Sequence, residues 1–376
     1  MRKRYAFIDL HRGWMLLLMV ETHIFNSLLN PALKQEAWFS VLNFINGLIA
    51  PSFIFISGFA FFLASRYKAE DYRKFGWEFY RQIGRIVLIL LTGYSLRMPH
   101  LSLDKMLTYW HLPCWQDFFS IDVLQCIAAG LVIMLIARII IKPDKKFALF
   151  LLSAAAVIIL VSPFIWQIDF ARLMPIYFAD YFNPSHGSLF PLFPWLAFMF
   201  TGGACSYYWK VSEDNESEHK FQIRLIYMSL IAIAVSCFIL YFPPEFMHGI
   251  SKLRPNAFFF LLRIGIILIM LMSLRFYELW KKTDGSLIIY AGRESLLVYW
   301  LHLQVIYRKL IGDRSINDIV AQRFGFWEAA LASILLCLVM VAAARLWSLT
   351  KKRYPLQARY AVISIVGLCI VYFLLN

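Results

Sequence analysis

Long apolar stretches recur along the whole chain, and they constrain its fold more than any other feature of the sequence. Several run for about 18 to 25 residues, which is the length that a helix needs to cross roughly 30 Å of hydrocarbon. The sequence therefore predicts an all-α polytopic membrane protein with about 11 transmembrane helices, and residues 1–376 are expected to form a single membrane-embedded domain. We place the spans at 6–29, 40–65, 83–98, 119–141, 147–166, 188–209, 222–243, 256–276, 286–308, 327–349 and 357–375.

The composition excludes two other classes of protein. Of the residues, 61% are hydrophobic and only 16% are charged, whereas a soluble domain needs more charge to cover its surface. The net charge of +14 invites a nucleic-acid interpretation, but Lys and Arg fall in short clusters between the apolar stretches. We therefore expect a lipid bilayer as the surroundings of the chain and no nucleic-acid partner.

The basic clusters indicate an orientation in the membrane. They precede the first predicted span and follow the second, fourth, eighth and tenth spans. Because cytoplasmic loops carry an excess of Lys and Arg, we expect a cytoplasmic N-terminus and a location in the inner membrane of the cell. The first apolar stretch is too long for a cleavable signal peptide and carries Asp9 and Arg12, so we interpret it as the first span.

The cysteines argue against two kinds of site. All six are scattered, and no Cys-x-x-Cys pair occurs. We therefore expect neither a zinc site nor a disulfide framework, and no metal cofactor. The sequence leaves the oligomeric state open.

Polar residues are unusually dense in the first predicted span. A charged or ionisable group at membrane depth costs several kcal/mol by most scales, so each one asks for a reason. Arg12 and His23 are eleven residues apart, which in a helix is three turns plus roughly 20°, so the two side chains point the same way about 16 Å apart along the axis. One face of this helix thus carries a fixed cation and a titratable base. The alternative is a His23 that a neighbouring helix merely satisfies.

The other predicted spans carry further candidates, each with a structural alternative. Arg81 and Arg85 lie one helical turn apart where the third span leaves the cytoplasm, although Arg side chains also reach headgroups routinely. Asp122 opens the fourth span and Asn46 lies in the second, and both could equally hold helices together. Two more ionisable residues lie inside the eighth and ninth spans: Arg263 and His302. Glu21 lies on a different face from His23, and we expect it to pair with a cation such as Arg97.

Several short segments resemble transmembrane acyltransferases, in the expected order along the chain. Residues 8–13 (Ile-Asp-Leu-His-Arg-Gly), with the stretch that follows to His23, resemble the opening of transmembrane acyltransferases, and the Arg12–His23 spacing resembles the signature of the bacterial acyltransferase family three. Four other segments are similar to heparan-α-glucosaminide N-acetyltransferase-like proteins: Ala-Pro-Ser-Phe-Ile-Phe-Ile-Ser-Gly at 50–58, Asp-Val-Leu-Gln-Cys-Ile-Ala at 122–128, Phe-Pro-Trp at 193–195 and Gly-Arg-Glu-Ser-Leu-Leu-Val-Tyr-Trp-Leu-His at 292–302.

The resemblance implies transfer of an acyl group, which we expect to be acetyl, from cytoplasmic acyl-CoA to a hydroxyl or amine of a glycan or lipid-linked sugar. By position, the resemblance makes His23 the catalytic base and Arg12 a contact of acetyl-CoA. Arg81 and Arg85 resemble the paired arginines that the family has at its cytoplasmic mouth. One departure concerns the heparan-type enzymes, which place their acting histidine in the outer loop before the second span. Here no histidine occurs between His23 and His100, so the expected base is His23 itself.

The remaining candidates receive supporting roles in this hypothesis. We expect Asp122 to orient His23 and Asn26 to stabilise the oxyanion, while Asn46, His302 and Arg263 contact the acceptor. Direct transfer and an acetyl-histidine intermediate both stay open. The competing interpretation is a transporter or flippase for a sugar-linked or anionic substrate, because buried ionisable residues and Pro-broken helices also suit a substrate pathway.

Overall fold

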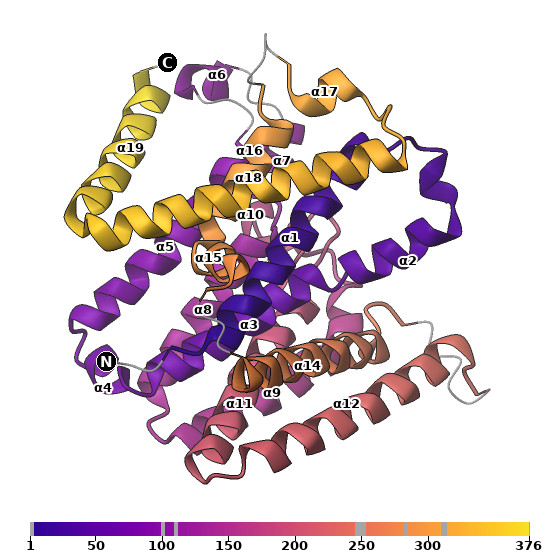
Figure 1. The fold of residues 1–376 in the computed structure, drawn as a ribbon, viewed down its shortest axis with the longest axis vertical. Helices are drawn as coiled ribbons and strands as arrows, with labels where there is room; N and C mark the ends of the chain where they lie inside the picture. The colour runs from indigo at the N-terminus through magenta and orange to yellow at the C-terminus, as the bar shows by residue number, and fades with distance from the viewer. Residues whose placement is uncertain are drawn as a thin grey trace. The chain divides into compact units, whose positions relative to one another are not determined.

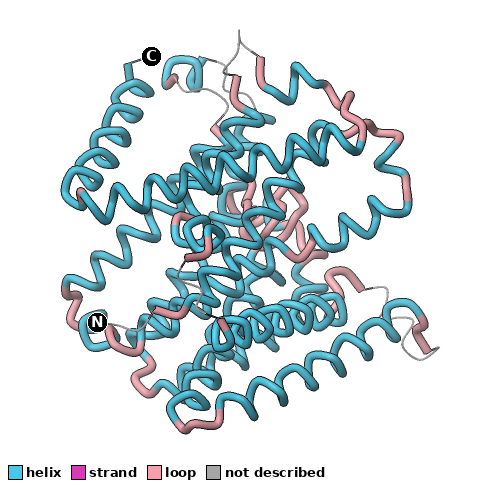
Figure 2. Tube along the Cα trace, viewed as in Figure 1, coloured by secondary structure: helices cyan, strands magenta, loops and turns pink. Residues whose placement is uncertain are grey.

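The computed structural model describes residues 4–98, 102–108, 112–244, 253–281, 285–309 and 314–375, without the side chains of 112–115. This part of the chain is built of helices and contains no strand (Figures 1 and 2). The predicted all-helical class is therefore confirmed. His100 lies outside the described residues. The helices fall into two compact units, each assembled from segments that are distant in the sequence.

The first unit combines both ends of the chain, Met1–Ile49 and Leu274–Asn376, with the segment Met98–His111. It holds the long helix α1, the helices that pack on it, and the end of α14. The helices are α1 (Ala6–Leu28), α2 (Ala37–Asn46), α6 (Leu103–Thr108), α15 (Leu287–Arg293), α16 (Ser295–Tyr307), α17 (Ile316–Val320), α18 (Phe326–Arg353) and α19 (Pro355–Leu375).

The second unit comprises Ala50–Arg97 and Leu112–Ser273. Its central pair is α11 and α9, with α8 beside α11 and α5 beside α8. The helices are α3 (Ile49–Ser65), α4 (Ala69–Arg73), α5 (Trp77–Arg97), α7 (Leu112–Phe119), α8 (Val123–Ile140), α9 (Asp144–Ile165), α10 (Ile176–Ala179), α11 (Leu192–Asp214), α12 (Glu218–Tyr241) and most of α14 (Ala257–Trp280).

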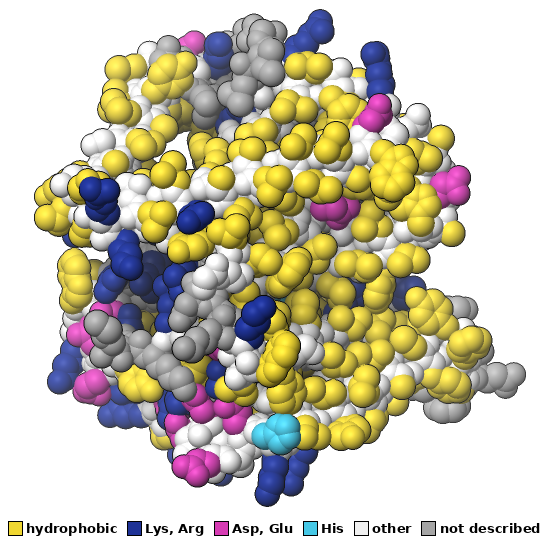
Figure 3. All heavy atoms as spheres, in the orientation of Figure 1, with side chains coloured by type: hydrophobic (Ala, Val, Ile, Leu, Met, Phe, Trp, Pro, Cys, Tyr) yellow, Lys and Arg dark blue, Asp and Glu magenta, His cyan; other side chains and the backbone are white. Residues whose placement is uncertain are grey.

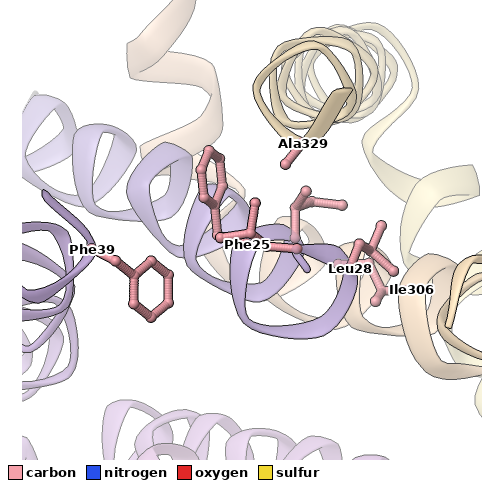
Figure 4. Packing of buried hydrophobic residues seen from close by; sticks show 7 residues of the cluster. Phe25, Leu28, Phe39, Ile306 and Ala329 are labelled. Carbon is pink, nitrogen blue, oxygen red and sulfur yellow. The ribbon is translucent and has the colours of Figure 1, made fainter. Parts of the chain in front are cut away.

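An apolar cluster fixes the C-terminal half of α1 in the first unit. Figure 4 shows Phe25 and Leu28 of α1 between Phe39 of α2, Ile306 of α16 and Ala329 of α18. All five side chains are at most 5% exposed. Burial of such a side chain stabilises a fold by roughly 1.5–3 kcal/mol relative to exposure to water. The stabilisation relative to exposure to lipid is smaller, because packing rather than the hydrophobic effect holds helices together in a membrane.

Two glycines allow α1 and α15 to approach at backbone distance. A Cβ atom on Gly13 would lie 2.3 Å from the Ile288 carbonyl oxygen, and one on Gly292 would lie 1.8 Å from the Asp9 carbonyl oxygen. Real side chains cannot occupy either position without moving a backbone. The same device joins α3 and α11 in the second unit, where Gly202 meets the Phe55 carbonyl. Small residues commonly permit this close packing between membrane helices.

Among the described residues, seven helical segments are long and apolar enough to cross a membrane, with α2 and α3 together forming one of them. Each predicted span falls on a helix, but the predicted number of about 11 is not confirmed. The four predicted spans outside this set correspond to α1, α5, α11 and the pair α15 and α16. Among the seven, α12, α18 and α19 bury the least of their length, and hydrophobic side chains cover the visible side of α18 in Figure 3. A large apolar surface of this kind suits a lipid environment.

Two predicted spans differ from single straight helices. The predicted ninth span is divided at Glu294 into α15 and α16. The predicted second span is divided after Asn46 into α2 and α3. At the break between α15 and α16, the Lys351 ammonium group binds the buried Glu294 carboxylate. The apolar pattern of the sequence does not reveal this ion pair.

Candidate active site around His23

Helix α1 carries the central residues of the candidate site. It is continuous from Ala6 to Leu28, so the predicted spacing of Arg12 and His23 holds along one helical face. Both side chains are partly buried, and α1 packs against α15, α16 and α18 of the same unit. The helix thus presents a cation and an imidazole from a rigidly packed element.

An ionic cluster surrounds the first turns of α1. The Asp9 carboxylate is 3% exposed and accepts hydrogen bonds from the guanidinium groups of Arg4, at 2.7 Å, and Arg293, at 3.4 Å. Arg12 lies in the field of Asp9 and Arg4. Within the described part of the chain, no hydrogen bond reaches the Arg12 guanidinium, so its donors stay available to an anionic ligand.

The His23 imidazole lies toward the C-terminal end of the same face, against a tyrosine from α16. Its Nδ1 atom is 3.2 Å from the Tyr307 hydroxyl oxygen. That oxygen is 2.5 Å from the Oγ atom of Ser27, one turn farther along α1. The His23 and Tyr307 rings meet edge to face, with centroids 5.8 Å apart. Two hydroxyl groups thus form a chain that ends on one nitrogen of the imidazole.

His302 lies beside His23, as the sequence-based hypothesis of a shared site requires. The two ring centroids are 5.3 Å apart. The His302 side chain is fully buried, and its Nδ1 donates a hydrogen bond of 2.8 Å to the Val298 carbonyl. Its Nε2 is buried and has no hydrogen-bond partner among the described residues. The structure therefore brings together two of the predicted site residues, from helices α1 and α16.

Glu21 and Asn46 form a separate polar spot in the first unit. Asn46 interacts with the Glu21 carboxylate, although within the described residues neither carboxylate oxygen has a hydrogen bond of good geometry. The expected pairing of Glu21 with a cation is wrong for the described residues, because Arg97 binds Asp122 and Ser120 instead. Asn26, in turn, is exposed, and its backbone carbonyl accepts a hydrogen bond from Lys34.

Asp122 has a structural role in the second unit. Its carboxylate caps the N-terminus of α8 by accepting a hydrogen bond of 2.7 Å from the Val123 backbone. It also forms an ion pair of 3.2 Å with Arg97. Capping groups of this kind are worth roughly 0.5–2 kcal/mol. The described contacts of Asp122 are thus those of a helix cap, and its predicted role in orienting His23 stays a prediction.

The three predicted arginine contacts also belong to the second unit. Arg81 and Arg85 are exposed on α5, and Arg81 lies 3.5 Å from Glu78 in an ion pair. Arg263 is 9% exposed on α14, and its guanidinium stacks over the Phe259 ring of the same helix at 3.3 Å from the centroid. Such cation–π contacts satisfy a buried cation. The cofactor and acceptor roles of these arginines stay predictions.

Sequence reasoning missed Tyr307 and Ser27. Ser27 follows His23 by four residues, so the helical period alone could have placed it on the same face. Tyr307 gives no such signal, because it is five residues from His302 and projects from a different side of the helix. Its contact with His23 joins residues 284 positions apart, which only the packing of α16 on α1 reveals.

Metal ligands do not gather anywhere in the described part of the chain. No group of three or more His, Cys, Asp or Glu residues there could hold a metal ion. The candidate site combines His23, Ser27 and Arg12 of α1 with His302 and Tyr307 of α16.

Comparison with known proteins identifies the family of the chain. A search of curated proteins returns no match to the chain. The family model described as "Heparan-alpha-glucosaminide N-acetyltransferase, catalytic" matches residues 4–243, which is well over half of the chain and includes all of α1. The matched range contains Arg12 and His23, whereas His302 and Tyr307 follow it. The chain belongs to the heparan-α-glucosaminide N-acetyltransferase catalytic-domain family.

Proposed function

We propose that the protein is a membrane acetyltransferase that moves an acetyl group from acetyl-CoA to an amine or hydroxyl of a sugar-containing acceptor. The observation that carries this proposal is the position of His23 on α1, inside the range that matches the family. Its imidazole lies against Tyr307 and His302, at one end of a face whose other end carries Arg12. Neutral imidazole is a competent base near pH 7.

The proposed step uses His23 as a general base. The acceptor amine or hydroxyl gives a proton to the imidazole while its nitrogen or oxygen bonds to the thioester carbonyl carbon. The carbon–sulfur bond then breaks, the acetyl group stays on the acceptor, and the CoA thiolate leaves and takes up the proton from the imidazolium. The same imidazole could instead attack the thioester first and carry the acetyl group as an intermediate.

Arg12 is the proposed contact for the donor in this unit. CoA carries several phosphate charges, and Arg binds phosphate with a planar fork of donors. The roughly 16 Å between Arg12 and His23 along α1 is on the scale of the pantetheine arm. Because acetyl-CoA is cytoplasmic, we also propose that the Arg12 end of α1 faces the cytoplasm. We propose further that the chain forms a single domain embedded in the inner membrane.

The experiment that tests the proposal measures acetyl transfer by the full chain in lipid nanodiscs. Labelled acetyl-CoA is the donor, glucosamine is the probe acceptor, and release of the CoA thiol is followed in parallel. We expect His23→Gln to lower kcat by about 10²- to 10⁴-fold, because this is the usual contribution of a general base. We also expect acetyl-CoA to raise the thermal unfolding temperature, which a transporter without a CoA site would not show.

A matched histidine provides the control for this experiment. His219 is exposed on α12 in the second unit, and His219→Gln should leave transfer unchanged. Undiminished transfer by His23→Gln would refute the assignment of the base. Equal loss in both variants would show that the substitutions act through the fold rather than through the reaction.

A further inference from the structure

A groove with apolar walls lies between α5 and α8 of the second unit. Its volume is about 370 Å³, and every side chain that lines it is apolar. Phe79 and Ile83 of α5 form one wall, and Val132, Ile136 and Ile140 of α8 lie in the other. The three α8 side chains are exposed, so the groove is open to the surroundings of the helices. In a membrane, those surroundings at an apolar surface are lipid chains.

The groove has the length of a lipid chain in one leaflet. From Val132 to Ile140, α8 rises about 12 Å. The hydrocarbon core of a bilayer is about 30 Å thick, so each leaflet takes up about half of it. Helices α5 and α8 run antiparallel, because Gly93 near the end of α5 approaches Gln125 near the start of α8, while Phe79 lines the same groove as Ile140. One acyl chain can therefore lie lengthwise between the two helices.

One end of the groove is basic. Phe75 lines this end, and it directly follows Arg73 and Lys74 in the chain. The Arg73 Nε atom donates a hydrogen bond of 3.2 Å to the Ile139 carbonyl, which places this cation at the last turn of α8. Lys142 comes just after the end of α8. Three cations thus lie near the last turn of α8, where the apolar walls end.

Carboxylates neutralise this basic end only in part. Glu70 pairs with Arg73 at 3.1 Å and lies 3.8 Å from the Lys74 ammonium group. The neighbouring Asp71 carboxylate accepts a hydrogen bond of 2.6 Å from the backbone of α5. Lys142 has no ion pair within the described part of the chain, and both lysines are exposed. The lysine ammonium groups can therefore take up a phosphate, to which Lys binds as a point charge.

We propose that the groove between α5 and α8 binds one acyl chain of an anionic phospholipid, whose phosphate lies against Lys74 and Lys142. The apolar walls hold the chain, and the basic end favours anionic over zwitterionic headgroups. All of these residues belong to the second unit. The inference is thus independent of the function proposed for His23.

Photo-crosslinking of the full chain tests the site. The protein is reconstituted in nanodiscs of phosphatidylcholine that contain a small fraction of phosphatidylglycerol with a diazirine on one acyl chain. Mass spectrometry maps the labelled peptides after irradiation. We expect the label to concentrate on residues 75–83 and 132–140. Unlabelled phosphatidylglycerol should displace it, whereas additional phosphatidylcholine should not.

Two variants test the two parts of the site separately. Lys74→Gln removes a charge from the basic end, and we expect it to lower labelling of the groove about fivefold, the usual effect of one basic side chain near anionic lipid. Ile136→Trp fills the groove and should lower labelling at least as much. The matched controls are Lys220→Gln and Ile231→Trp, at exposed positions of α12 in the same unit, and they should leave labelling unchanged. The unfolding temperature of each variant checks that it is folded.

Three results would overturn the inference. The first is labelling of α5 and α8 that is no stronger than that of α12 and α19, which is what bulk lipid or a groove covered by a second copy of the chain would produce. The second is equal displacement of the label by phosphatidylcholine. The third is unchanged labelling in Lys74→Gln and Ile136→Trp. None of these results bears on acetyl transfer, which His23→Gln tests by itself.

Discussion

Among single residues, Asp180 stands out as an ionisable carboxyl group in a buried position. It caps the short helix α10 in the segment between α9 and α11, is fully buried, and has no hydrogen bond to either carboxylate oxygen within the described residues. Burial raises the pKa of Asp180 from 3.8 to about 6, although His186 and Arg97 lower it in part. A buried carboxylate without hydrogen bonds destabilises the folded state once it is ionised.

The raised pKa of Asp180 predicts how stability depends on pH. The folded protein binds this proton up to about pH 6, whereas the unfolded chain releases it near 3.8, so this contribution to stability is greatest below pH 3.8 and falls as pH rises through 6. We expect Asp180→Asn to raise the unfolding temperature at pH 7.5 and to lose this advantage at pH 4. The gap in pKa corresponds to about 3 kcal/mol at neutral pH, at one pKa unit per 1.36 kcal/mol.

Thermal unfolding in detergent across this pH range measures the effect. Asp169 provides a control in the same segment, because His186 hydrogen-bonds it and lowers the pKa of its carboxyl group. Asp169→Asn should therefore not raise the unfolding temperature at neutral pH. A higher unfolding temperature for Asp180→Asn at pH 4 than at pH 7.5, relative to the natural protein, would contradict the assignment.

The helical period predicts the geometry of the candidate site only for residues that lie on the same helix. The helical period places Arg12 and His23 on the same face, and continuous α1 has this spacing. The period cannot show which residue of a distant helix meets His23, so Tyr307 was missed. It also cannot distinguish a carboxylate that orients an imidazole from one that caps its own helix, which is what the contacts of Asp122 are.

Among the helices of the first unit, the contact between α1 and α15 determines the packing. Gly13 and Gly292 lie on opposite partners of this contact, and each faces a backbone carbonyl of the other helix. The close approach also lets Arg293 of α15 reach the Asp9 carboxylate. The geometry of the Arg12 end of the site therefore depends on two positions without a side chain.

A methyl group at this contact should be poorly tolerated. We expect Gly292→Ala to lower stability by about 1 to 3 kcal/mol, the usual cost of overpacking, because its Cβ would lie 1.8 Å from the Asp9 carbonyl oxygen. The matched substitution Gly367→Ala in α19 meets nothing within 4 Å and should be neutral or slightly stabilising. Unfolding temperatures of both variants in detergent provide the measurement, and equal values would refute the role of the contact.

The apolar pattern of the sequence predicted the positions of the helices, but it did not predict the breaks within the spans. A long apolar run has the same appearance whether the helix continues or stops, so the predicted span 286–308 concealed the interruption at Glu294. A charged residue in such a run was the available signal. Its physical reason appears only in three dimensions, where Lys351 of α18 binds the Glu294 carboxylate.

The number of membrane crossings is a property of the whole molecule. Helix α1 is not among the seven apolar helices, and it carries Asp9, His11, Arg12, Glu21 and His23. Ionisable residues lower the hydropathy of α1, the helix to which the proposed function is assigned. A count based on hydropathy alone therefore underestimates helices that line a site.

The most direct test of the account is a structure of the full chain in lipid with CoA bound. The account predicts that the thiol lies beside the His23 imidazole and that the phosphates lie toward the Arg12 end of α1. A thiol remote from His23, or a face of α1 between Arg12 and His23 that is closed by packed side chains or turned toward lipid, would contradict it.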